Sequence, residues 1–198
     1  GMVLMRRHDL AGIDLSVSRP SSTAIFGDCI ELLILPTEDI VEELTSRGIS
    51  LVAIDSPLNL TNKPYRDVER VLLSRGYKLL PLNMKGMREL AIEGIKLKEK
   101  LEAVGIEVIE THPRSARLAL GFHNVSDFSK LIMKYLKLCS ERDLSKDDID
   151  AITCLLVSLL YRHGKAEIIS GKEGTIVLPA SGIQLDTFLA NLSDSMEE

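Results

Sequence analysis

Three short apolar runs in this chain each end in an acidic residue. They are Leu10–Asp14, Leu51–Asp55 and Val108–Glu110. Apolar, β-branched runs of this length are typical of strands that are buried on both faces of a parallel sheet. A carboxylate that closes a buried strand loses its hydration, which is costly unless a cation or a hydrogen-bond donor compensates. If the three strands are parallel neighbours, the three carboxylates meet at one edge of the sheet.

The order of the other expected elements is also distinctive. A strand over residues 8–16 is followed by two more around a turn at Gly27-Asp28, and Thr37 is a suitable N-cap for the first helix. The predicted strands are 8–16, 23–26, 29–35, 50–54 and 106–109; the predicted helices are 37–47, 65–74, 85–104, 113–121, 126–139 and 145–160; and a hairpin is expected over 167–178. The sequence therefore predicts an α/β fold with a mixed five-stranded sheet in the order β-β-β-α-β-α-β-α, flanking helices and a C-terminal hairpin.

Length and composition indicate one globular domain. Its predicted bounds are residues 2–198, because Gly1 before Met2 resembles a tag remnant and is left out. The chain is 45% hydrophobic and 27% charged, which is ordinary for a globular protein. No signal peptide is visible, and no apolar run reaches the roughly 20 residues of a membrane span. Cys29, Cys139 and Cys154 are odd in number and widely spaced, so we expect reduced thiols and a cytoplasmic location without membrane association.

The charge distribution bears on the kind of partner. The net charge of −5 disfavours nucleic acid, yet residues 60–105 carry ten basic against six acidic side chains. This basic stretch predicts either a solvated helix face or a nucleic-acid contact. Aromatic residues make up only 4% of the chain and tryptophan is absent. Since few rings are available to stack on bases, a structured or duplex nucleic acid held through its phosphates suits the chain better than a single strand.

A fourth acidic group opens the last long helix. Ser145 and Asp148 have the spacing of a capping box, which makes Asp148 the capping residue. Asp147 lies in the first turn, where it either favours the helix dipole or joins the acidic site. Asp150 lies one turn later on the same face and beyond any capping need, so it is the stronger candidate for a metal ligand.

These motifs resemble known nucleases. Gly12-Ile-Asp14, Val52–Pro57 and Asp147–Ile152 are similar to the acidic motifs of RuvC-type junction resolvases, in which the first-strand aspartate is a metal ligand. A closer match is an uncharacterised family of predicted nucleases with a ribonuclease-H-like fold, the domain-of-unknown-function family four-two-nine. Its further features in this chain are Arg66-x-x-Glu69-Arg70, Ile109–Pro113 and Gly174–Pro179. The resemblance implies a ribonuclease-H-like, metal-dependent nuclease, a nucleic-acid partner and, as in RuvC-type enzymes, a homodimer.

Carboxylate oxygens suit hard cations such as Mg²⁺ or Mn²⁺, and two such ions can promote phosphodiester hydrolysis. We expect Asp14 to be the central ligand, with Asp55, Glu110 and Asp150 as further metal ligands and Asp147 as an additional catalytic residue. Asp14 and Asp55 could instead accept loop N–H groups. Glu110 could instead pair with Arg66, Arg70 or Arg114 in a structural network.

Four residues are candidates for substrate binding: Arg66, Arg70, His112 and Arg114. Arg66 and Arg70 lie one turn apart and could hold a phosphate through forked hydrogen bonds, or form ion pairs with neighbouring acids. His112 could be a general base or a phosphate contact, or only structural beside its proline. As an alternative function, the chain could be a non-catalytic module that binds a metal or a protein partner at its acidic edge. A nucleotide-cleft enzyme of the sugar-kinase type would need a second such domain.

Overall fold

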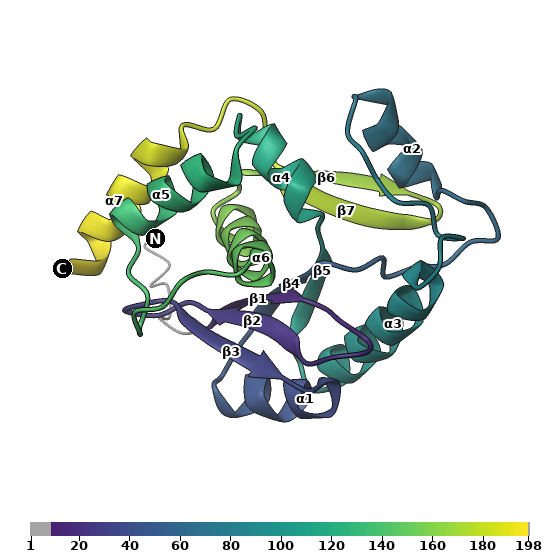
Figure 1. Cartoon of the computed structure of the whole chain (residues 1–198), viewed down its shortest axis with the longest axis horizontal. Helices are drawn as coiled ribbons and strands as arrows, with labels where there is room; N and C mark the ends of the chain where they lie inside the picture. Colours follow the sequence, from purple (N-terminus) through teal and green to yellow (C-terminus); the bar gives the residue numbers. More distant parts are fainter. Residues whose placement is uncertain (1–8, 198) are drawn as a thin grey trace.

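The computed structural model describes residues 9–197, and a mixed five-stranded sheet forms its centre (Figure 1). The strand order is β3-β2-β1-β4-β5, with β1, β2 and β3 antiparallel and with β4 and β5 parallel to β1. The predicted mixed sheet is therefore confirmed. The strands are β1 (Leu10–Asp14), β2 (Ser21–Ile25), β3 (Glu31–Leu35), β4 (Leu51–Ile54) and β5 (Glu107–Glu110).

Helices cover both faces of the sheet, so the central strands are apolar on both sides. Helices α1 (Thr37–Ser46) and α3 (Met87–Ala103) pack on one face through Ile40, Leu44 and Leu101. The other face is covered by α6 (Lys146–Arg162), which Figure 1 shows nearly end-on beside β1. The helices pack on the two faces of the sheet in this way because each of them buries an apolar stripe.

Gly12 sets how closely α6 approaches β1. A Cβ atom placed on Gly12 would lie 2.2 Å from the backbone nitrogen of Leu155 and 2.4 Å from the carbonyl oxygen of Ala151. No side chain fits in that space, so only glycine permits this packing. The close approach brings the N-terminal turn of α6 to the edge of the sheet where β1 ends.

The remaining elements lie on the same side of the sheet as α6 and contribute to the same apolar core. The hairpin predicted at the C-terminal side is present as β6 (Ala166–Gly171) and β7 (Gly174–Pro179). Three of the other helices match predicted ones within a few residues: α2 (Asp67–Ser74), α4 (Pro113–Ala119) and α5 (Val125–Tyr135). Helix α7 (Leu185–Glu197) was not predicted, although its buried Leu185, Phe188, Leu189 and Leu192 recur at helical spacing.

Two smaller expectations need correction. Pro36, not Thr37, is the N-cap of α1, because the helix already begins at Thr37. No side chain forms a capping hydrogen bond at this end of α1. Cys29 and Cys139 form a disulfide with a Cα–Cα distance of 5.0 Å, so the expectation of three reduced thiols is wrong for this pair. Their separation of 110 residues gave no sign of the pairing, which depends on the fold. Cys154 is a free, buried thiol.

None of the helices within residues 9–197 has both the length and the apolar character needed to cross a bilayer. A cytoplasmic location stays a prediction.

Candidate metal centre

Strand register places three acidic residues at one edge of the sheet. Asp14 is the last residue of β1, Asp55 directly follows β4, and Glu110 ends β5. Ile13 pairs with Ile54, and Ile54 in turn pairs with Glu110. These neighbouring strands are parallel, so their carboxyl ends lie side by side.

Helix α6 brings two further carboxylates to the end of β1. Asp147 and Asp150 lie one turn apart near the start of α6, and each offers an oxygen to a cluster with Asp14. The oxygens of Asp14, Asp147 and Asp150 all lie within 4.8 Å of one another. The cluster therefore joins the first strand to the last long helix, as the close contact at Gly12 allows.

Asp14 and Asp55 interact directly. Burial raises the pKa of Asp14 to about 7, with a further rise from the charge of Asp150, and a hydrogen bond from Asp55 acts in the opposite direction. Burial, followed by the charges of Asp14 and Asp150, raises the pKa of Asp55 well above its usual value. Close packing of these carboxyl groups thus disfavours the ionisation of all of them at once. Such mutual repulsion among buried carboxylates favours a bound cation.

Two arginines offset part of this negative charge. Arg117, on α4, donates to Asp150 at 2.8 Å and to the hydroxyl of Thr153 at 2.9 Å. Arg19, in the loop after β1, lies 2.8 Å from a carboxylate oxygen of Asp147 but is largely exposed. Arg117 is only 7% exposed, so it fixes the Asp150 carboxylate from inside the protein. No sequence pattern indicates a role for Arg117, because only the packing of α4 on α6 brings this side chain to Asp150.

Glu110 does not belong to the three-residue cluster, and its carboxylate is paired with Arg66. Its two oxygens accept hydrogen bonds from the Arg66 guanidinium at 2.9 and 2.5 Å, and Oε1 also accepts from the backbone N–H of Leu58 at 2.8 Å. Arg66 is fully buried and also donates to Glu69. The structural network that the sequence left open for Glu110 is therefore present. Arg66 has no exposed donor for a phosphate.

The other candidate residues have varied surroundings. His112 is the N-cap of α4, where its Nδ1 accepts from the backbone N–H of Ser115 at 3.3 Å. Burial, with Arg117 and Arg114 nearby, lowers the pKa of His112 to about 4, which keeps the ring neutral. Asp148 forms the predicted capping box with Ser145 and is nearly fully buried. Arg70 is exposed on α2, and Arg114 is exposed on α4.

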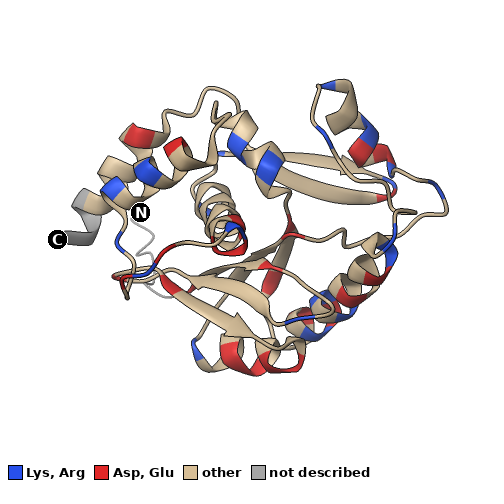
Figure 2. Cartoon of the chain, viewed as in Figure 1, with Lys and Arg blue, Asp and Glu red and all other residues tan. Residues whose placement is uncertain are grey.

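A cavity of about 910 Å³ opens beside the cluster, and both Asp55 and Asp150 line it. Basic residues, Arg114 among them, line this cavity. Figure 2 shows basic residues on α4, whereas α3 carries both basic and acidic residues. The lining of the cavity also includes His112 and Arg117. Arg70 does not line this cavity.

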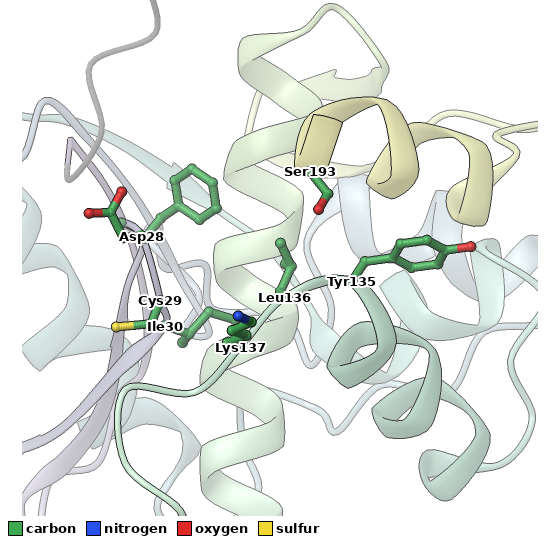
Figure 3. A pocket seen from close by; sticks show the side chains of 9 residues that line it. Asp28, Cys29, Ile30, Tyr135, Leu136, Lys137 and Ser193 are labelled. Carbon is green, nitrogen blue, oxygen red and sulfur yellow. The ribbon is translucent and has the colours of Figure 1, made fainter. Parts of the chain in front are cut away.

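A second, smaller cavity of about 200 Å³ lies near the disulfide (Figure 3). Cys29 and Ile30 line it from the turn between β2 and β3, and Tyr135 lines it from the end of α5. Ser22 pairs with Asp14, whereas Ile25 at the other end of β2 pairs with Glu31. This cavity is therefore at the end of the sheet opposite the acidic cluster.

The donor set fits a hard divalent cation. All three clustered side chains offer carboxylate oxygens, and the adjacent Asp55 offers a fourth. Oxygen-only sites of this kind suit Mg²⁺, Mn²⁺ or Ca²⁺ rather than zinc, which favours nitrogen and sulfur ligands. The chain thus contains an aspartate triad that could bind a metal ion.

Comparison with known proteins supports the fold. No family model matches the chain, and no curated protein matches it. Among solved structures it is similar to T. thermophilus RuvC in complex with Holliday junction substrate, with a TM-score of 0.51 and 14% sequence identity. The match covers 78% of this chain and 95% of that chain. The predicted ribonuclease-H-like fold is confirmed, whereas membership of family four-two-nine stays a prediction.

Proposed function

We propose that this protein is a metal-dependent nuclease that hydrolyses phosphodiester bonds. The observation that carries the proposal is the convergence of Asp14, Asp147 and Asp150 within 4.8 Å at the edge of a ribonuclease-H-like sheet. The structurally similar RuvC was solved with a Holliday junction, which makes nucleic acid the first substrate class to test. Fold similarity alone does not establish activity, so the acidic cluster is the essential support.

Asp14, Asp147, Asp150 and Asp55 would hold the cation. When bound, Mg²⁺ or Mn²⁺ supplies Lewis-acid chemistry at a phosphate and lowers the pKa of a water molecule. Asp14 is central, because it is adjacent both to the α6 pair and to Asp55. Glu110 is left out of this ligand set, since Arg66 and the Leu58 N–H already use its oxygens.

Arg117 acts on the site as a positioning residue. Its hydrogen bonds to Asp150 and Thr153 tie α4 to α6 and fix the direction of the Asp150 carboxylate. Asp147 is held less firmly, because its partner Arg19 is 65% exposed. We infer that an incoming phosphate or cation displaces the Arg19 contact while the Arg117 contact remains.

A cleavage assay tests this function. Purified protein is incubated with Mn²⁺ and labelled four-way junctions, nicked duplexes, RNA–DNA hybrids and single strands. We expect cleavage of at least one substrate by the wild type and its loss in Asp150→Asn. Asp39→Asn is the matched control, because Asp39 is exposed on α1, on the other face of the sheet. Cleavage that persists in Asp150→Asn would show that the cluster is not the active site.

One observation favours a second function, a non-catalytic module that binds a metal or protein partner at the acidic edge. Arg117 pairs with Asp150 and Arg19 pairs with Asp147, so arginines offset the charge of two of the three clustered carboxylates. Mn²⁺ binding by the wild type without cleavage of any of these substrates would support this alternative.

A further inference from the structure

We infer that the cavity beside Asp55 and Asp150 receives the base of one unpaired nucleotide, so that the substrate is nucleic acid containing an unstacked residue. This inference rests on the proposed nuclease function and specifies its substrate class. The proposed substrate thus differs from the continuous duplex that the low aromatic content of the sequence favours.

The first support is the shape and position of the cavity. Its volume of about 910 Å³ lies within the ~300–1,000 Å³ typical of sites that enclose small molecules. Asp55 and Asp150 form part of its wall, so an enclosed group lies next to the aspartate cluster. In a continuous duplex the bases are stacked inside, and one reaches such a cavity only by leaving the stack.

The second support is the apolar part of the lining. Most of it is contributed by three segments: the chain before α3, α3 itself, and α4 with the turn that follows it. Leu80 is 54% exposed and Phe122 is half-buried, so both retain surface for a ligand. Phe122 packs edge-on against Phe128, with ring centroids 5.5 Å apart, which holds its ring in place. Apolar residues of these segments that line the cavity include Leu79, Leu80, Met87, Leu90, Leu118 and Phe122.

The third support is the charge of the lining. Lys78, Arg114 and Lys146 line the same cavity and are exposed. Within residues 9–193, no carboxylate lies within ion-pair distance of any of them. Unpaired cations next to an apolar cavity complement a nucleotide, which joins an apolar base to an anionic phosphate. A purely apolar ligand would leave these cations without a partner.

A binding experiment separates the base pocket from catalysis. Fluorescence anisotropy in Ca²⁺ compares two labelled DNA duplexes that differ only by a single bulged nucleotide. The variants are Leu80→Ser and Phe122→Leu. Ile168→Ser is the matched control, because Ile168 on β6 is equally exposed, at 56%, and does not line the cavity.

We expect the wild type and Ile168→Ser to bind the bulged duplex about tenfold more tightly than the continuous one. Leu80→Ser and Phe122→Leu should lose most of this preference. Equal affinity for the two duplexes, or a preference that both pocket variants retain, would overturn the inference. A preference of this kind in a protein that never cleaves in Mn²⁺ supports the pocket while it rejects the nuclease. Equal cleavage of both duplexes by all variants supports the nuclease while it rejects the pocket.

Discussion

Glu110 accepts two parallel hydrogen bonds from the guanidinium of Arg66, and both side chains are almost completely buried. Removal of one partner from a buried ion pair leaves the other charge without compensation, which typically costs about 3–5 kcal/mol. Glu110→Gln should therefore lower the free energy of unfolding by about 3 kcal/mol, measured by urea denaturation.

The same variant distinguishes a structural from a metal-binding role for Glu110. If Glu110 only positions Arg66 and Leu58, folded Glu110→Gln should bind Mn²⁺ as tightly as the wild type. Glu99→Gln, at an exposed position on α3, is the control and should change neither property. A large loss of Mn²⁺ affinity in Glu110→Gln would return Glu110 to the ligand set.

Gly12→Ala tests the contact between β1 and α6. The added methyl would lie 2.2 Å from the Leu155 nitrogen, so the helix must move away from the strand. Overpacking of this kind costs about 1–3 kcal/mol, and more where backbone is the obstacle. We expect a fall of about 3 kcal/mol in the free energy of unfolding, together with weaker Mn²⁺ binding, since Asp150 moves with α6. A variant with unchanged stability would show that this packing is looser than described.

The Cys29–Cys139 disulfide closes a loop of more than a hundred residues, with a sequence separation of 110. A cross-link of this span restricts the unfolded chain and typically contributes about 2–5 kcal/mol. Reductant should therefore lower the denaturation midpoint of the wild type. The double variant Cys29→Ser/Cys139→Ser is the control, because reductant should leave it unchanged. An identical midpoint with and without reductant in the wild type would mean that the disulfide does not contribute.

His112 makes stability depend on pH. Its pKa is lowered from 6.5 to about 4 in the folded protein, so the unfolded state binds more protons between these values. The stability that neutral His112 contributes is complete above about pH 6.5 and is lost as pH falls toward 4. We expect a loss of about 1–3 kcal/mol over this range, measured by denaturation at several pH values.

His112→Asn is the matched variant for that measurement, since asparagine is a good N-cap that does not titrate. The difference in stability between wild type and variant should shrink or reverse as pH falls. A difference that stays constant with pH would contradict a neutral His112 in the folded protein.

Most of the fold could be predicted from local patterns. The apolar run Leu51–Asp55 and the capping box at Ser145 and Asp148 are local signals, and both correspond to elements of the structure. The helix Leu185–Glu197 also has a local signal in the helical spacing of its apolar residues, although it was not predicted. The disulfide was beyond local reasoning, because two cysteines far apart in sequence meet only through the tertiary fold.

The candidate site was only partly predictable, because some of its contacts join segments that are far apart in the sequence. Acidic strand ends pointed to Asp14 and Asp55, and helical spacing pointed to Asp147 and Asp150. No local pattern could show that Arg66 binds Glu110 or that Arg117 binds Asp150, since each pair joins separate elements. Nor could the sequence show the cavity, which residues from several distant segments enclose.

The central claim is that the aspartate cluster binds a divalent cation, and calorimetric titration of Mn²⁺ tests it most directly. The proteins to compare are the wild type, Asp14→Asn, which keeps the side-chain shape while it removes the charge, and the surface control Asp39→Asn. We expect the wild type and Asp39→Asn to bind Mn²⁺ with equal affinity, and Asp14→Asn to bind at least about tenfold more weakly. Equal binding by Asp14→Asn, or no binding by the wild type, would contradict the account.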